Sequence, residues 1–109
     1  MLKKKYRLSW GVRFNSSRSF SSPFFIVKVR PNTLLFNRFG LIISKKIEKR
    51  AVYRNRIKRL IHSIVVEFYD NIKNGIDALF IIKKSAVGKT RKELYLAMKQ
   101  MFSKEGLLK

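Results

Sequence analysis

The hydrophobic residues of this 109-residue chain follow two periods, one typical of strands and one typical of helices. FFIVKVR, residues 24–30, is rich in aromatic and β-branched residues. Phe25, Val27 and Val29 alternate with Phe24, Ile26 and Lys28, so we predict a strand there. RFGLIIS, residues 38–44, is apolar almost throughout, which predicts a second strand, buried on both faces or central in a sheet. IDALFIIKK, residues 76–84, predicts a third strand.

The period changes to that of a helix after residue 50. Apolar residues then recur at i, i+3, i+4 and i+7 over about three turns, which predicts an amphipathic helix from near Ala51 to near Asn71. Its apolar stripe consists of Ile57, Leu60, Ile61, Ile64, Val65 and Phe68. We expect Gly75 to act as the stop signal after this helix.

Two further helices are predicted, one near each end of the chain. SWGVRF, residues 9–14, begins with a Ser in a capping position, although Gly11 disfavours a helix. Residues 15–23, which follow, are rich in Ser and predict a loop. Thr90 and Glu93 form a capping-box sequence ahead of the last helix. The apolar stripe of that helix consists of Leu94, Ala97, Met98, Met101 and Phe102.

The order of these elements predicts the fold class. Helices and strands in the order α-β-β(-β)-α-β-α favour an α+β fold, built as a two-layer sandwich with helices against one sheet. The length predicts a single domain over residues 1–109. Residues 1–8 form a basic lead-in that we expect to be flexible.

The charge of the chain points to a polyanionic partner. There are 26 Lys and Arg residues against 6 Asp and Glu residues, which gives a net charge of +20. Like charges at this density oppose compaction unless a partner neutralises them. The chain has no Cys, which excludes disulfides, thiolate zinc sites and thiol nucleophiles. No apolar run has the length of a signal peptide or membrane span, so we expect a cytoplasmic chain with no membrane partner.

No complete protein active site is visible in the sequence. A nuclease that works through two metal ions needs several carboxylates around them, but the acidic residues here are scattered. Glu67 and Asp70 share a helix face, where solvated charges are a better interpretation than a metal site. His62 is the only histidine, and no neighbouring residue is placed to orient or activate it. Its one candidate role is RNA contact.

The predicted long helix and its approach carry a dense group of cations. Basic residues near a helix N-terminus oppose the helix dipole, so this group is better explained by a polyanion than by helix stability. Arginine offers a planar fork to phosphates, and asparagine can donate to and accept from a base edge or ribose. The candidate RNA-binding residues are Lys45, Lys46, Lys49, Arg50, Arg54, Asn55, Arg56, Lys58 and Arg59.

Residues 38–61, RFGLIISKKIEKRAVYRNRIKRLI, closely resemble the bacterial ribonuclease P protein subunit. They match its strand ending in Ser-Lys-Lys, its short basic spacer and its Arg-Asn-Arg-x-Lys-Arg helix, in that order. KKYRL followed by Phe14, and the last strand and helix over residues 77–104, extend the resemblance across nearly the whole chain.

The resemblance implies a function that composition does not. Members of this family bind a large catalytic RNA and precursor tRNA, and the RNA removes the 5′ leader with Mg²⁺. The implied partners are therefore that RNA and precursor tRNA, with Mg²⁺ held mainly by the RNA, no organic cofactor and no obligate protein partner. The Arg-Asn-Arg helix is implied to face both RNAs. The family also has a left-handed strand–helix–strand crossover around this helix.

The resemblance further implies a cleft for the single-stranded leader. Phe14 matches a cleft aromatic of the family, and Phe24 and Lys28 are the other candidates here. Phe24 and Phe25 are the candidates for the family's strand aromatic in the cleft, and core packing is the favoured role for either. Residues 15–20 depart from the family pattern, because they are several residues shorter than the corresponding segment.

Two other functions fit the charge and size of the chain. One is a small ribosomal protein or another structural RNA-binding protein. The other is a metal-dependent nuclease that cuts RNA without an RNA partner.

Overall fold

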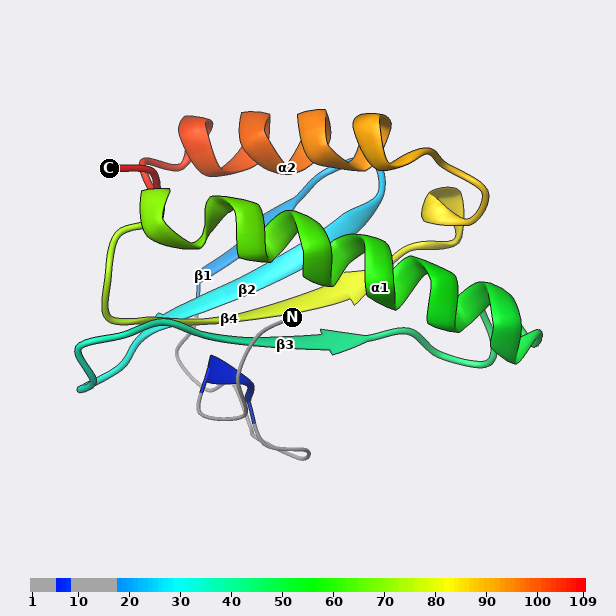
Figure 1. Cartoon of the computed structure of the whole chain (residues 1–109), viewed down its shortest axis with the longest axis horizontal. Helices are drawn as coiled ribbons and strands as arrows, with labels where there is room; N and C mark the ends of the chain where they lie inside the picture. Colours follow the sequence, from blue (N-terminus) through cyan, green and yellow to red (C-terminus); the bar gives the residue numbers. More distant parts are fainter. Residues whose placement is uncertain (1–5, 9–17) are drawn as a thin grey trace.

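The computed structural model describes residues 6–8 and 18–109 (Figure 1). The helix predicted for residues 9–14 lies outside the described residues. The elements are β1 (Arg18–Ser21), β2 (Phe25–Pro31), β3 (Arg38–Ile42), α1 (Ala51–Phe68), η2 (Tyr69–Asn71), β4 (Ile76–Ile82), η3 (Lys84–Ala86) and α2 (Arg91–Lys104). The predicted α+β sandwich is confirmed.

One four-stranded sheet carries both helices on the same face. The strand order is β1-β2-β4-β3, with β3 and β4 parallel and the other neighbours antiparallel. In Figure 1, β3 and β4 both run from left to right and α1 returns in front of the sheet, so the crossover is left-handed. This hand is rare for parallel strands. It lets α1 follow β3 directly and leaves its N-terminal end beyond the strands.

The core lies between the sheet and the two helices. Phe25, Val27 and Val29 of β2 are buried, as the alternation predicted, and they pack with the buried residues of α1 and α2. Along α1 the predicted stripe is buried except for Leu60, which is half-buried. Burial of this stripe holds α1 against the sheet, so its opposite side chains have fixed positions.

The two long helices begin where the sequence predicted. α1 starts at Ala51 without a side-chain cap and without an acidic residue in its first turn. α2 starts after Thr90, whose hydroxyl accepts from the Glu93 N–H at 3.2 Å, while the Glu93 carboxylate accepts from the Thr90 N–H at 3.0 Å. The capping box is therefore confirmed. Gly75, with φ of 85°, serves the turn before β4 and not the helix end, because the 3₁₀ turn η2 already follows α1.

The prediction of a loop over residues 15–23 is wrong for β1. Residues 18–21 pair antiparallel with β2, and Ser22 closes the hairpin by accepting from the Phe24 and Phe25 N–H groups at 3.3 and 3.1 Å. Backbone pairing, and not side-chain hydrophobicity, makes this segment a strand. Its Ser-rich composition therefore gave no signal.

The prediction that β3 is buried on both faces or central is also wrong, because β3 is an edge strand. Phe39 is buried under the helices, and Ile42 is 41% exposed. The described part of the lead-in, residues 6–8, lies against this edge, whereas we expected a flexible segment. The Leu8 N–H donates to the Phe39 carbonyl at 2.9 Å, and the Tyr6 ring packs 5.1 Å from that of Tyr69.

The helix-free face of the sheet contains a buried ionic network that joins three strands. Asp77 of β4 has no exposed surface and accepts from Arg30 of β2 at 3.2 Å and from Arg38 of β3 at 2.9 and 2.7 Å. Asn32 adds a hydrogen bond of 2.9 Å. Burial alone would raise the pKa of Asp77, but the bonds from Arg38, Asn32 and Arg30 outweigh it, so this pKa is lowered.

No helix within the described residues is long and apolar enough to cross a membrane.

Candidate nucleic-acid interface

The N-terminal end of α1 projects beyond the sheet and carries the predicted cations. In Figure 1 its first turns extend past the ends of β3 and β4. The approach from β3 turns back at residues 45–47, where the Ser44 carbonyl accepts from the N–H groups of Ile47 and Glu48 at 3.1 and 3.3 Å. The Lys45 and Lys46 side chains of this turn are exposed to solvent.

Glu48 organises the approach to α1. Its side chain is largely covered, and the guanidinium of Arg50 donates to both carboxylate oxygens. The hydrogen bond from Arg50 lowers the pKa of Glu48, and the same bond raises the pKa of Arg50. The Arg50 guanidinium also lies 3.9 Å from the centroid of the Tyr53 ring. Arg50 is therefore held between a carboxylate and an aromatic ring.

Arg54 folds back onto the same approach. Its Nη1 donates to the carbonyls of Glu48 and Lys49 at 2.8 and 2.7 Å, and its side chain is half-buried. The sequence predicts Arg54 as an RNA-binding residue. The structure adds a local role, because Arg54 satisfies two carbonyls just before a helix that lacks a side-chain cap.

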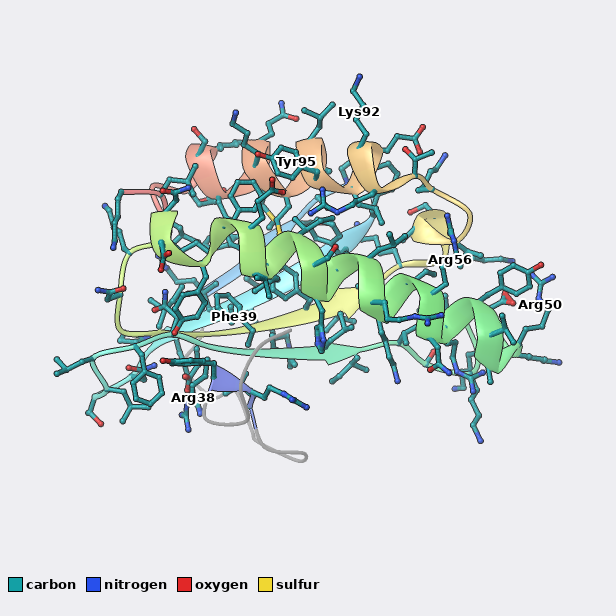
Figure 2. The ribbon with its side chains drawn as sticks, in the orientation of Figure 1. Arg38, Phe39, Arg50, Arg56, Lys92 and Tyr95 are labelled. Carbon is teal, nitrogen blue, oxygen red and sulfur yellow. The ribbon has the colours of Figure 1, made fainter. Side chains whose placement is uncertain are left out.

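The other predicted residues present their side chains to solvent. Arg56 and Lys58 are exposed and make no hydrogen bond or ion pair within the described part of the chain. Figure 2 shows Arg50 at the tip of the projecting end and Arg56 further along the same helix. The exposed residues of the predicted set are Lys45, Lys46, Lys49, Arg50, Asn55, Arg56, Lys58 and Arg59. We call these exposed residues of the approach and of the first half of α1, taken together, the α1 surface.

The α1 surface includes an open hollow that holds His62. Among the described residues, the hollow of about 360 Å³ is lined by Asn55, Lys58, Arg59 and His62. Burial lowers the pKa of His62, and the nearby charges of Arg7 and Lys58 add to this effect. The lowered pKa favours the neutral imidazole, which can donate from one ring nitrogen and accept at the other.

The three candidate leader residues have different surroundings. Phe14 lies outside the described residues. Phe24 is half-buried against the core, and the ammonium of Lys89 lies 5.7 Å from its ring centroid. Lys28 lies on the helix-free face of β2, where its register neighbours are Ser19 of β1 and Leu79 of β4.

The described residues contain no group of three or more His, Asp or Glu side chains able to hold a metal ion. The Glu67 carboxylate accepts from Arg91 of α2 at 3.1 Å. Glu67 is therefore an exposed charge, as predicted, and it also forms a surface ion pair between the two helices.

Sequence reasoning missed the residues that organise this site. Glu48 is one of six acidic residues scattered along the chain, and nothing in the sequence indicates that it orders Arg50. Tyr53 is the second of these residues. Its position four residues before Ile57 continues the apolar stripe, and that spacing was the available signal.

Comparison with known families identifies relatives along almost the entire chain. A family model described as Ribonuclease P matches residues 2–106. The ribonuclease P protein component of Clostridium kluyveri is 36% identical, covering 95% of this chain and 97% of the relative. That of Bacillus cereus strain AH187 is 33% identical, covering 97% of this chain and 96% of the relative.

Solved structures share the fold. The RNase P protein of Staphylococcus aureus superposes with a TM-score of 0.86 at 23% identity, covering 97% of this chain and all of that one. The RNase P protein of Thermotoga maritima gives a TM-score of 0.75 at 20% identity, covering 82% of this chain and 84% of that one. At these identities the likeness concerns the fold alone.

Proposed function

This chain belongs to the ribonuclease P protein family, and from that membership we propose that it binds the catalytic RNA of ribonuclease P and precursor tRNA in the cytoplasm. The protein acts there as the component that assists removal of the 5′ leader during tRNA maturation. The relatives reported above are ribonuclease P protein components, which favours this function over that of a ribosomal protein.

The observation that carries the proposal is the α1 surface on a helix fixed by its buried stripe. Exposed cations without protein partners bind phosphates and release counterions, whereas paired ones contribute less. Arg56, Lys58 and Arg59 are the residues we expect to contact phosphates, with Asn55 beside them. Lys45, Lys46 and Lys49 extend this contact along the approach. We expect Arg50 and Arg54 to shape the surface as well as add charge.

We assign the chemistry to the RNA. Phosphodiester hydrolysis at neutral pH needs metal ions at the scissile bond. We propose that the Mg²⁺ ions are bound mainly by the RNA, with the protein neutralising phosphate repulsion between catalytic RNA and substrate. In this scheme the protein needs no organic cofactor and no further protein partner.

The leader is proposed to lie along the helix-free face of the sheet. Lys28 supplies a cation near the centre of that face. Phe14 and Phe24 are the aromatic candidates for stacking with leader bases. For Phe24, packing against the core competes with this role.

Reconstitution tests the proposed function. The full chain is added to its ribonuclease P RNA and to precursor tRNA at low Mg²⁺, where we expect the RNA alone to cleave slowly. The protein should raise the cleavage rate and the affinity for precursor tRNA. A matched substrate without the leader should show a smaller gain if the leader is bound. No gain in rate or affinity with either substrate would overturn the proposal.

A second arm separates this function from that of an independent nuclease. The purified chain with Mg²⁺ and precursor tRNA, but without the catalytic RNA, should leave the substrate intact. Specific cleavage in this sample would assign the chemistry to the protein.

A further inference from the structure

The apolar stripe of α1 continues into the projecting end, where the sheet no longer covers it. Tyr53 lies four residues before the buried Ile57, at a stripe position. It is nevertheless 41% exposed, and the adjacent Val52 is 73% exposed. An aromatic ring and an aliphatic side chain therefore face solvent in the midst of the α1 surface, where core packing does not require them.

The Tyr53 ring is held in place from one side. The guanidinium of Arg50 stacks on it with 3.9 Å between Cζ and the ring centroid. The same guanidinium donates through Nε and Nη2 to the largely covered carboxylate of Glu48. The order Glu48, Arg50, Tyr53 thus forms a chain of contacts in which a carboxylate fixes a cation and the cation fixes a ring.

The contacts with Glu48 and Tyr53 make Arg50 a weaker phosphate ligand than a free arginine. Two of its donor nitrogens point to Glu48, and the pair has no net charge, so its attraction for a phosphate is reduced. The ring keeps an accessible surface, and its hydroxyl makes no hydrogen bond within the described residues. Exposed cations flank it, namely Lys49 before the helix and Arg56 one turn along it.

A flat uncharged surface bordered by cations suits an unpaired nucleobase whose phosphates lie on either side. Aromatic side chains bind single-stranded RNA in this way, because every base has a face that can stack. We propose that Tyr53 is a stacking site for one unpaired base of the RNA partner, with Arg50 as the positioning residue that holds the ring. This inference rests on the proposed function, since it assumes that the α1 surface binds RNA.

The test compares the full chain with its Tyr53→Phe and Tyr53→Leu variants in binding to the ribonuclease P RNA at several salt concentrations. Tyr53→Leu keeps an apolar side chain but removes the ring, so affinity should fall about 5- to 150-fold, which corresponds to about 1–3 kcal/mol for one base stack. Tyr53→Phe keeps the ring and should bind within about twofold of the unchanged chain. Neither variant should alter the salt dependence, because no phosphate contact is lost.

Several outcomes would overturn the stacking site while leaving the proposed function intact. One is equal binding by Tyr53→Leu and the unchanged chain. Another is an equal loss in both variants, which would assign the contact to the hydroxyl. A shallower salt slope in Tyr53→Leu would show that phosphate contacts had moved, and a changed oligomeric state would point to a protein occupant. If the unchanged chain itself fails to bind the RNA, the proposed function fails first.

The positioning role of Arg50 has its own readout. Glu48→Ala removes a negative charge, so a simple charge effect would strengthen RNA binding. If Glu48 orders Arg50 and Tyr53, affinity should instead fall by part of the Tyr53→Leu loss. Glu67→Ala is the matched control, because Glu67 also pairs with an arginine but lies away from the ring. Tighter binding by both variants would contradict the positioning role.

Discussion

Arg54 and Arg56 stand two residues apart in one motif but have different surroundings. Arg54 donates to two carbonyls of the approach to α1, whereas Arg56 is exposed and makes no hydrogen bond or ion pair within the described residues. One side chain supports the surface, and the other is available to a ligand. Periodicity could not separate them, because the fold-back of Arg54 depends on the turn at residues 45–47.

Alanine at each position should therefore give different results. Arg56→Ala should leave the melting temperature unchanged and reduce the slope of log affinity against log salt by about one unit, as expected for one lost phosphate contact. Arg54→Ala should weaken RNA binding and also lower the free energy of unfolding by about 1–2 kcal/mol, because two carbonyls lose a charged donor. RNA titrations and thermal melts measure both effects. Identical melts for the two variants would contradict the structural role of Arg54.

Gly40 of β3 lies where the neighbouring side chains leave little space for a Cβ atom. A Cβ built at this position would stand 3.1 Å from Leu79 Cδ1 and 3.1 Å from Leu8 Cβ. Gly40→Ala should therefore destabilise the fold by about 1–3 kcal/mol through overpacking. Leu79→Ala in the same chain removes the Cδ1 atom and should therefore relieve part of this loss. Denaturant unfolding of the two single variants and the double variant tests the coupling, and strict additivity would rule it out.

At the scale of elements, the helices and strands with a clear hydrophobic period or capping sequence could be predicted. α1, α2, β2 and β4 follow from periodicity and the Thr90–Glu93 capping box. β1 and the edge position of β3 did not, because both depend on which backbone pairs with which. The cations of the α1 surface were visible in the sequence. The roles of Glu48 and Tyr53 depend on three-dimensional contacts with Arg50. These contacts cannot be predicted from the sequence positions of an acidic residue and a tyrosine.

Asp77 joins β2, β3 and β4, and its lowered pKa gives that link a pH dependence. The folded pKa lies below the ordinary value of 3.8, so the unfolded chain takes up a proton more readily. The stabilisation is complete above that value and is lost as the pH falls through the folded pKa. Asp77→Asn should therefore unfold more easily than the unchanged chain at neutral pH, and the gap should narrow at low pH.

Chemical unfolding at pH 7 and near pH 3 would measure that gap. Asp70→Asn is the control, since Asp70 is exposed on η2 and forms no ion pair with any described residue. It should leave the unfolding curve unchanged at both pH values. If the difference in unfolding free energy between Asp77→Asn and the unchanged chain does not vary with pH, the network stabilises the fold through packing and neutral hydrogen bonds and not through the charge of Asp77.

At the scale of the whole molecule, the net charge of +20 is poorly compensated within the fold. Of the six acidic residues, Asp77 and Glu48 are largely covered and already paired, and Glu67 pairs with Arg91. The remaining field repels itself, and the RNA partner is the ligand that relieves it. The same charges thus favour RNA binding and oppose folding of the free chain.

Added salt should therefore stabilise the folded free chain and weaken its binding to RNA. Raising NaCl from about 20 to about 500 mM shortens the screening length, so the melting temperature of the free chain should rise while its affinity for RNA falls. A chain with Lys45→Gln and Lys46→Gln, two exposed changes that reduce the net charge, should show a smaller rise. Thermal melts and RNA titrations in the same buffers provide the comparison. A melting temperature that falls with salt would mean that ion pairs such as Arg91–Glu67 outweigh the repulsion.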